Sequence, residues 1–89
     1  MKRAKIQIEG IVQGVGFRNF VRQNATYLKL KGFTKNNQDD TVLVLVEGSE
    51  EAINLLIEKC WQGPPLSKVT KITLEDQEYK GEFNSFKIK

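Results

Sequence analysis

The chain contains no histidine, only one cysteine and little net charge. The lack of histidine excludes the commonest general base, and one cysteine cannot form an internal disulfide. No apolar run is long enough to span a bilayer or to act as a secretory signal, so we expect a cytoplasmic protein that binds no membrane. A net charge of +3 is too small to indicate nucleic-acid binding, although it would help to attract an anionic substrate.

The most informative stretch is the glycine-rich segment Gly10-Ile-Val-Gln-Gly-Val-Gly-Phe-Arg18, which joins a predicted strand to a predicted helix. A helix N-terminus carries partial positive charge, so the cation of Arg18 is unfavourable there unless an anion lies nearby. Glycines at 10, 14 and 16 allow positive φ angles and a close approach of N–H groups to that anion. The segment therefore indicates a pocket sized for phosphate.

Three familiar phosphate motifs do not fit this segment. A Walker A loop ends in Gly-Lys-Ser/Thr, whereas Phe17 and Arg18 follow Gly16. A dinucleotide fingerprint needs glycine where Asn19 stands, and a cysteine-dependent phosphatase needs a cysteine that the segment lacks. Taken alone, the segment fits an anion site and a tight turn with a surface arginine about equally well.

Apolar periodicity predicts the order β-α-β-β-α-β with an additional strand at the end. The predicted elements are a strand through Ile6, Ile8 and Gly10; a helix with Phe17, Phe20, Val21, Ala25 and Leu28 on one stripe; strands at 31–36 and Val42–Val46; a helix with Ile53, Leu56, Ile57 and Cys60 on one stripe; a strand around Val69 and Ile72; and a strand at Phe86 and Ile88.

Several local signals refine this order. The strand Val42–Val46 is apolar on both faces, which predicts a central position in the sheet. Ser49 is a suitable N-cap for the second helix, and Gly63-Pro64-Pro65 ends it. Irregular alternation predicts a bulge around Thr70-Lys71. Without any repeat or linker, residues 1–89 are expected to form one domain of the α+β class, a ferredoxin-like sandwich with two helices on one face of a mainly antiparallel sheet.

Two sequence blocks resemble the signatures of the acylphosphatase family. The first is Gly10–Arg18, and the second is Gly32-Phe33-Thr34-Lys35-Asn36, followed by Val42 and Gly48. The resemblance implies that Arg18 and the N–H groups of Gln13, Gly14, Val15, Gly16 and Phe17 bind phosphate. It also implies that the Asn36 side chain orients the attacking water, so that Arg18 and Asn36 are the catalytic residues.

This chain departs from the family pattern at three positions. Asp40 stands where a turn glycine is usual, Thr34 replaces a small apolar residue, and Lys29 stands where a glycine commonly ends the first helix. Aspartate tolerates left-handed backbone geometry, so Asp40 can still form the turn at some cost. None of the three changes affects the Gly10–Arg18 segment or Asn36.

The predicted topology brings both blocks to one site. In this fold the first and second strands run parallel with the third between them, so their C-terminal ends lie at the same edge of the sheet. Two strand spacings separate these ends by roughly 10 Å, a gap that a phosphate, a water and the long Arg18 side chain could fill. Because Asn36 shares this edge of the sheet with the glycine-rich segment, a functional role for Asn36 is favoured over that of a polar residue near a turn.

The resemblance implies hydrolysis of the carboxyl–phosphate anhydride bond of acyl phosphates. The leaving carboxylate has a pKa of about 4 and needs no general acid, which is consistent with the lack of histidine. We expect no cofactor and no metal, because Asp39, Asp40 and Glu47 do not have ligand spacing. The expected partners are a small acyl phosphate and a bound phosphate or sulfate, with no nucleic acid, and the protein is expected to be a monomer.

An RNA-binding module is the first alternative function. Lys31-Gly32-Phe33 is similar to the start of an RNA-recognition strand, but the aromatic residues that should follow are missing. A non-catalytic domain that senses anions is the second alternative. Cys60 and Trp61 are expected to be packing residues rather than reactive or binding groups.

Overall fold

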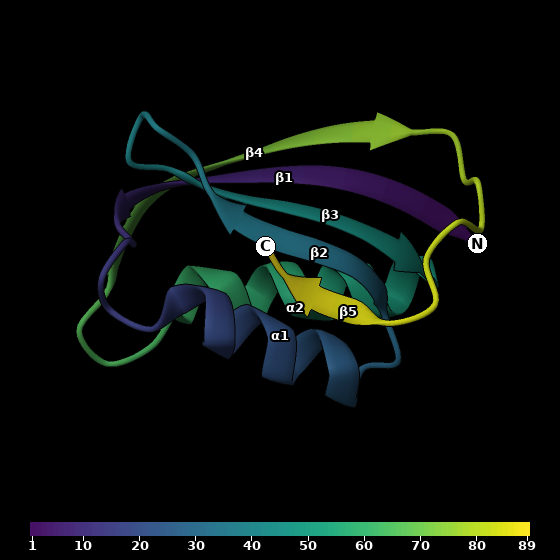
Figure 1. The fold of residues 1–89 in the computed structure, drawn as a ribbon, viewed down its shortest axis with the longest axis horizontal. Helices are drawn as coiled ribbons and strands as arrows, with labels where there is room; N and C mark the ends of the chain where they lie inside the picture. Colours follow the sequence, from purple (N-terminus) through teal and green to yellow (C-terminus); the bar gives the residue numbers. More distant parts are fainter.

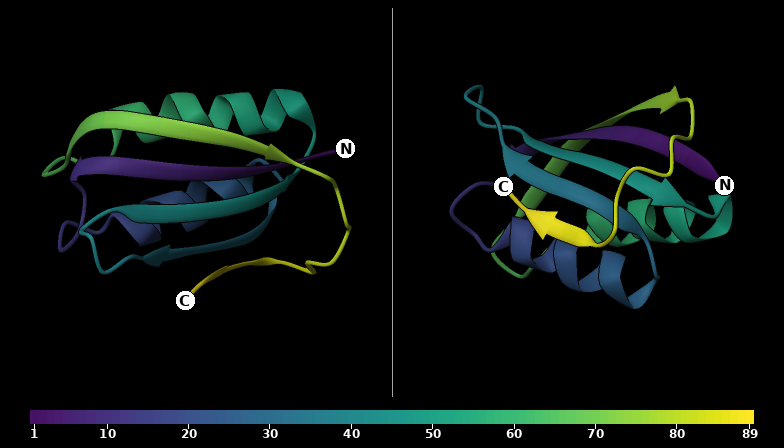
Figure 2. Two further views of the ribbon diagram at one scale, coloured as in Figure 1. Left: turned by 90° about the horizontal axis from the view of Figure 1, so that it is seen from above. Right: turned by 45° about the vertical axis from the view of Figure 1, so that its right-hand side comes forward.

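Five strands form a single sheet in the computed structural model, which describes residues 1–89. Their order across the sheet is β4-β1-β3-β2-β5 (Figure 2). The strands are β1 (Lys2–Ile11), β2 (Lys31–Asn36), β3 (Val42–Gly48), β4 (Lys68–Gln77) and β5 (Phe86–Ile88). The predicted central place of β3 is confirmed, because a strand that is apolar on both faces avoids water best in the middle of a sheet.

The pairing of β1 and β2 with β3 determines where the site can lie. Both pairs are antiparallel, so β1 and β2 run parallel to each other on either side of β3, as the sequence predicts. The loop after β1 and the hairpin after β2 consequently lie at the same end of the molecule, opposite the N-terminus (Figure 1). The short β5 pairs parallel with β2, with Thr34 opposite Ile88.

Two helices, α1 (Phe17–Tyr27) and α2 (Glu50–Gln62), cover one face of the sheet (Figure 1). Their apolar stripes and the inward side chains of the strands form one core, comprising Ala4, Ile6, Ile8, Val12, Phe17, Val21, Ala25, Leu30, Val42, Val44, Val46, Ile53, Leu56, Cys60 and Phe86. Ser49 caps α2 as predicted, accepting a hydrogen bond from the N–H of Ala52 at 3.1 Å. The architecture is the expected ferredoxin-like sandwich.

A bulge interrupts the pairing of β1 with β4. Glu9 pairs with Lys71 and Gly10 pairs with Val69, which leaves Thr70 as the extra residue. A side chain at position 10 would collide with the carbonyl oxygen of Lys68, so glycine is the residue that lets the two strands approach here. The predicted bulge is therefore confirmed.

The open face of the sheet carries a buried ion pair between Arg3 and Glu47 that the sequence did not predict. Glu47 Oε2 accepts hydrogen bonds from Arg3 Nη1 at 3.2 Å and from the N–H groups of Lys80 at 2.8 Å and Gly81 at 3.2 Å. Arg3 also donates to Glu82. The pair thus anchors the segment between β4 and β5 to the centre of the sheet.

The side chains of Trp61 in α2 and Thr34 in β2 differ in their exposure to solvent. Trp61 was expected to pack at the end of α2, but half of it is exposed, and that prediction is wrong. Thr34 is fully buried, and its hydroxyl donates to the carbonyl of Leu43 at 2.8 Å, so the polar residue is satisfied in the core. Neither helix has the length and apolar character needed to cross a membrane.

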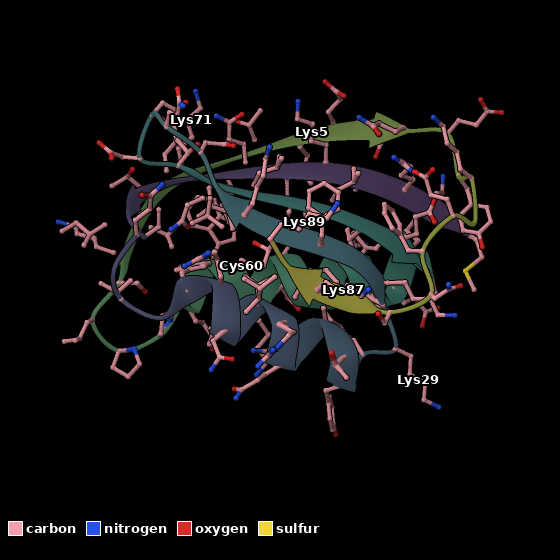
Figure 3. All side chains as sticks on the ribbon, viewed as in Figure 1. Lys5, Lys29, Cys60, Lys71, Lys87 and Lys89 are labelled. Atoms are coloured by element: carbon pink, nitrogen blue, oxygen red, sulfur yellow. The ribbon has the colours of Figure 1, made fainter.

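The end of α1 is a Schellman motif with lysine at its left-handed position. Lys29 has φ 62°, its N–H donates to Thr26 at 3.0 Å, and the N–H of Leu30 donates to Ala25 at 2.8 Å. The side chain of Lys29 extends into solvent beyond the helix (Figure 3). The helix consequently ends where a glycine would normally stand, and the lysine backbone is strained.

Replacement of Lys29 with glycine is expected to raise the free energy of unfolding by about 1 kcal/mol. The gain arises because glycine adopts a positive φ without steric cost, and thermal denaturation should show the midpoint rising by roughly 4–8 °C. Lys29→Ala is the matched control, since alanine removes the charge but keeps the strain. An equal gain from both substitutions would contradict the explanation.

Candidate active site

A small cavity lies where the loop after β1 meets the end of β2. Its volume is about 170 Å³, and its lining consists of Val12, Gly14, Gly16, Phe17, Arg18, Asn19, Asn36 and Ile88. Arg18 is the one charged residue among them, and no acidic side chain lines the cavity. A small, electropositive hollow of this kind favours an anion.

The loop between β1 and α1, residues 12–16, is here called the glycine loop. Gly14 and Gly16 have φ angles of 74° and 81°, a conformation that a side chain would strain. Gly16 is the N-cap of α1, and the first turn of the helix contains no acidic residue. The N–H groups of residues 13–19 donate no hydrogen bond within the protein. A row of free donors at a helix N-terminus is therefore available to bind an anion.

Arg18 lies in the first turn of α1, at the edge of the cavity. Its Nη1 donates to the main-chain oxygen of Lys89 at 3.3 Å, and the adjacent Ile88 forms part of the cavity wall. The end of β5 thus forms one wall of the cavity, and the contact with Lys89 holds the Arg18 guanidinium beside that wall. Because this contact depends on the parallel pairing of β5 with β2, no local pattern in the sequence could have revealed it.

Asn36 is the last residue of β2 and lines the cavity. It pairs with Val42 in the β2–β3 ladder. Its Oδ1 is buried and has no hydrogen-bond partner. An unpaired buried acceptor costs about 1–3 kcal/mol, and in a native protein such an atom calls for an explanation. The structure therefore brings Asn36 together with Gly14, Gly16 and Arg18, as the topology predicted.

Two residues of the predicted phosphate-binding set do not line the cavity. Val15 packs against the core. The side chain of Gln13 turns toward the β2–β3 hairpin, where it donates to the carbonyls of Asn37 and Thr41. Only the main-chain N–H groups of Gln13 and Val15 are therefore available to an anion.

Three lining residues were missed by the sequence analysis. Asn19 lies in the first turn of α1, two residues after Phe17. That position could have indicated from the sequence that Asn19 adjoins the predicted pocket. Val12 is the first residue of the glycine loop and is buried. Ile88 comes from β5, and its place beside the loop follows from long-range pairing alone.

Other reactive side chains lie outside the site. Cys60 is fully buried between α2 and the sheet, as predicted (Figure 3), and burial raises the pKa of its thiol to about 12. Hydrogen bonds from the hydroxyl and the N–H of Thr41 lower the pKa of Asp39, which belongs to the hairpin. No three histidine, cysteine or acidic side chains come together as a metal ion would require.

The aromatic side chain of β2 is engaged within the protein. The ring of Phe33 lies edge-on to that of Phe83 with 6.0 Å between centroids, and Lys89 Nζ lies 4.1 Å from the centre of the Phe33 ring. A free stacking surface for RNA bases is not formed at this position. This arrangement weighs against the RNA-binding alternative.

Fold and site together define a ferredoxin-like domain with a small cavity at a helix N-terminus, lined by one cation and by no acidic side chain. The chain belongs to the acylphosphatase family, because the family model described as Acylphosphatase matches residues 4–88. It is 43% identical to an acylphosphatase of Pelotomaculum thermopropionicum over 97% of this chain and 94% of that protein. It is 42% identical to an acylphosphatase of Thermotoga maritima, covering 100% of this chain and 98% of the relative.

A solved structure supports the same conclusion. The crystal structure of acylphosphatase from Bacillus subtilis superposes with a TM-score of 0.95 at 40% identity, covering 99% of this chain and 98% of the other. At this identity the agreement extends beyond the fold to the family. The resemblance seen in the two sequence blocks is therefore confirmed.

Proposed function

We propose that this protein hydrolyses the carboxyl–phosphate anhydride bond of small acyl phosphates, giving a carboxylate and inorganic phosphate. The observation that carries the proposal is the cavity that the free N–H groups of the glycine loop, the single cation of Arg18 and the side chain of Asn36 share, together with the unsatisfied amide of Asn36. Phosphate oxygens would accept from the N–H groups and the guanidinium. The side-chain amide of Asn36 would form a hydrogen bond with the attacking water.

The reaction requires little beyond positioning and charge stabilisation. Water attacks the phosphorus atom, the bond from phosphorus to the acyl oxygen breaks, and the electron pair leaves with the carboxylate. The leaving group has a pKa of about 4 and departs unprotonated, while the proton of the water passes to an oxygen of the phosphoryl group. Donors already aimed at the phosphoryl oxygens stabilise the transition state without rearrangement.

We further propose that the reaction needs no metal ion, because the guanidinium and the helix N-terminus supply the positive charge. The test is phosphate release from acetyl phosphate or benzoyl phosphate by the purified protein in the presence of EDTA. Turnover under these conditions supports the proposal. Binding of phosphate or sulfate without turnover would indicate an anion-sensing domain instead.

Replacement of Asn36 with alanine is expected to lower kcat about 10²-fold while KM changes less than about threefold. The reason is that the amide orients water and makes little contact with the substrate, so its loss affects the transition state rather than binding. Thermal denaturation should show no loss of stability, since Asn36 Oδ1 makes no hydrogen bond that the fold would lose and the substitution removes an unpaired buried acceptor.

Asn24→Ala is the control for this experiment. Asn24 is an asparagine of α1 whose amide donates to the carbonyl of Phe20 at 2.8 Å, and it does not line the cavity. Its substitution should leave kcat unchanged. If Asn36→Ala raised KM and left kcat intact, Asn36 would be a binding residue and not the one that orients water.

A further inference from the structure

The side chain of Gln13 connects the glycine loop to the β2–β3 hairpin. Its Nε2 donates to the carbonyl of Asn37 at 2.8 Å and to the carbonyl of Thr41 at 2.9 Å. An amide nitrogen carries two hydrogens, so both are used. No other residue of the glycine loop forms a hydrogen bond with the hairpin.

The two acceptors of Gln13 are themselves held in place. The N–H of Asn37 donates to the carbonyl of Thr41 at 2.9 Å, and Asn37 Nδ2 donates to Thr41 Oγ1 at 3.0 Å. The hydroxyl of Thr41 in turn donates to Asp39 Oδ1 at 2.6 Å. Gln13 therefore binds a hairpin end with a defined shape, and not a mobile turn.

Both acceptors of Gln13 lie next to Asn36, either in the sequence or through the strand pairing. Asn37 follows Asn36 directly, and Thr41 precedes Val42, the residue that pairs with Asn36 in the ladder. The phosphate would lie on the glycine loop, whereas the water would lie on Asn36. These two parts of the site come from different strands, so their separation depends on what joins the loop to the hairpin.

We propose that Gln13 is a positioning residue, whose two hydrogen bonds set the distance between the phosphate-binding loop and Asn36. The proposal rests on the function proposed above and adds a role for a side chain that lines no part of the cavity. In-line attack requires the water to be accurately placed relative to the phosphorus atom, and a displacement of about 1 Å can lower the rate roughly 10²-fold. Loss of the two bonds should consequently slow the chemical step and leave phosphate binding nearly intact.

The test uses Gln13→Met, which keeps the length of the side chain and removes both donors. We expect kcat for benzoyl phosphate to fall about 10- to 100-fold and KM to change less than about threefold. A double-mutant cycle provides the decisive readout. In the Asn36→Ala background, where no amide remains to be positioned, Gln13→Met should lower kcat by less than about threefold.

Gln7→Met is the matched control. Gln7 also approaches Thr41, with its Nε2 3.4 Å from Thr41 Oγ1, but this contact joins β1 to the hairpin and does not involve the glycine loop. It should leave kcat and KM unchanged. A rise in KM with unchanged kcat in Gln13→Met, or an undiminished effect in the Asn36→Ala background, would overturn the proposal.

A second measurement does not depend on activity or on the folding of a variant. In the parent protein, nuclear magnetic resonance should show slow hydrogen exchange of the Gln13 side-chain amide, compared with the exposed amide of Gln23. Exchange as fast as that of Gln23 would show that the two bonds are absent and would overturn the proposal. If the parent bound phosphate without turnover, the proposed function would fail, while this exchange measurement would still test the contact.

Discussion

Replacement of Arg18 with alanine is expected to lower kcat/KM for an acyl phosphate about 10³-fold or more, the range found when an arginine that stabilises a phosphoryl transition state is removed. Arg18 is the single charged residue that lines the cavity, so no other lining residue can supply the lost positive charge. Both binding and rate should suffer, because the guanidinium would contact the phosphoryl oxygens before and during the reaction. Steady-state kinetics and calorimetric titration with phosphate measure the two effects.

Two comparison variants sharpen the Arg18 experiment. Arg18→Lys keeps the charge but loses the planar fork, and it should lie between the parent and Arg18→Ala. Lys59→Ala removes one positive charge from the last turn of α2, outside the cavity, and should change kcat/KM less than about twofold. If Lys59→Ala and Arg18→Ala lowered activity equally, the effect would be one of overall charge and the proposed role of Arg18 would be wrong.

Replacement of Glu47 with alanine is expected to lower the free energy of unfolding by about 3 kcal/mol or more. The substitution leaves the guanidinium of Arg3 buried with Glu82 as its remaining carboxylate partner, and it leaves the N–H groups of Lys80 and Gly81 without their acceptor. A chain of this length has a total stability of roughly 5–13 kcal/mol. The thermal midpoint should fall by roughly 12–24 °C.

The same carboxyl group should make stability depend on pH. Burial alone would raise the pKa of Glu47, but hydrogen bonds from the Lys80 N–H, Arg3 and the Gly81 N–H outweigh it and hold the pKa below its ordinary value. A carboxyl whose pKa is lowered in the folded state stabilises the protein above the unfolded pKa of about 4.3, and this contribution is lost as the pH falls. Unfolding free energies of the parent should therefore decrease below about pH 5, and Glu47→Gln should flatten that decrease.

Glu58→Ala serves as the control for both measurements. Glu58 is an exposed residue of α2 without an ion-pair partner, so its removal should change stability by less than about 0.5 kcal/mol and preserve the pH dependence. A loss of stability in Glu47→Ala no larger than that in Glu58→Ala would mean that the buried pair contributes nothing to the attachment of the segment between β4 and β5.

The sequence could predict much of the site because its main parts are local or follow from topology. The glycine loop and Arg18 lie within nine consecutive residues, where spacing and residue type already restrict the backbone. The place of Asn36 could be predicted indirectly, because the order of elements brings the C-terminal ends of the parallel strands β1 and β2 to the same edge of the sheet. The departure at Asp40 could be interpreted from the sequence, whereas Lys29 left the end of the first helix open. Both residues have left-handed φ angles in the structure.

What the sequence by itself determined is the order of the elements, the central place of β3, the bulge in β4 and the residue types of the anion pocket. These features depend on apolar periodicity and on the conformations open to neighbouring residues. Only the tertiary structure decided that Gln13 joins the loop to the hairpin, that Ile88 walls the cavity, and that Glu47 is buried against Arg3. Each of these contacts joins residues far apart in the chain, and a polar residue looks the same in a sequence whether it will face water or a distant partner.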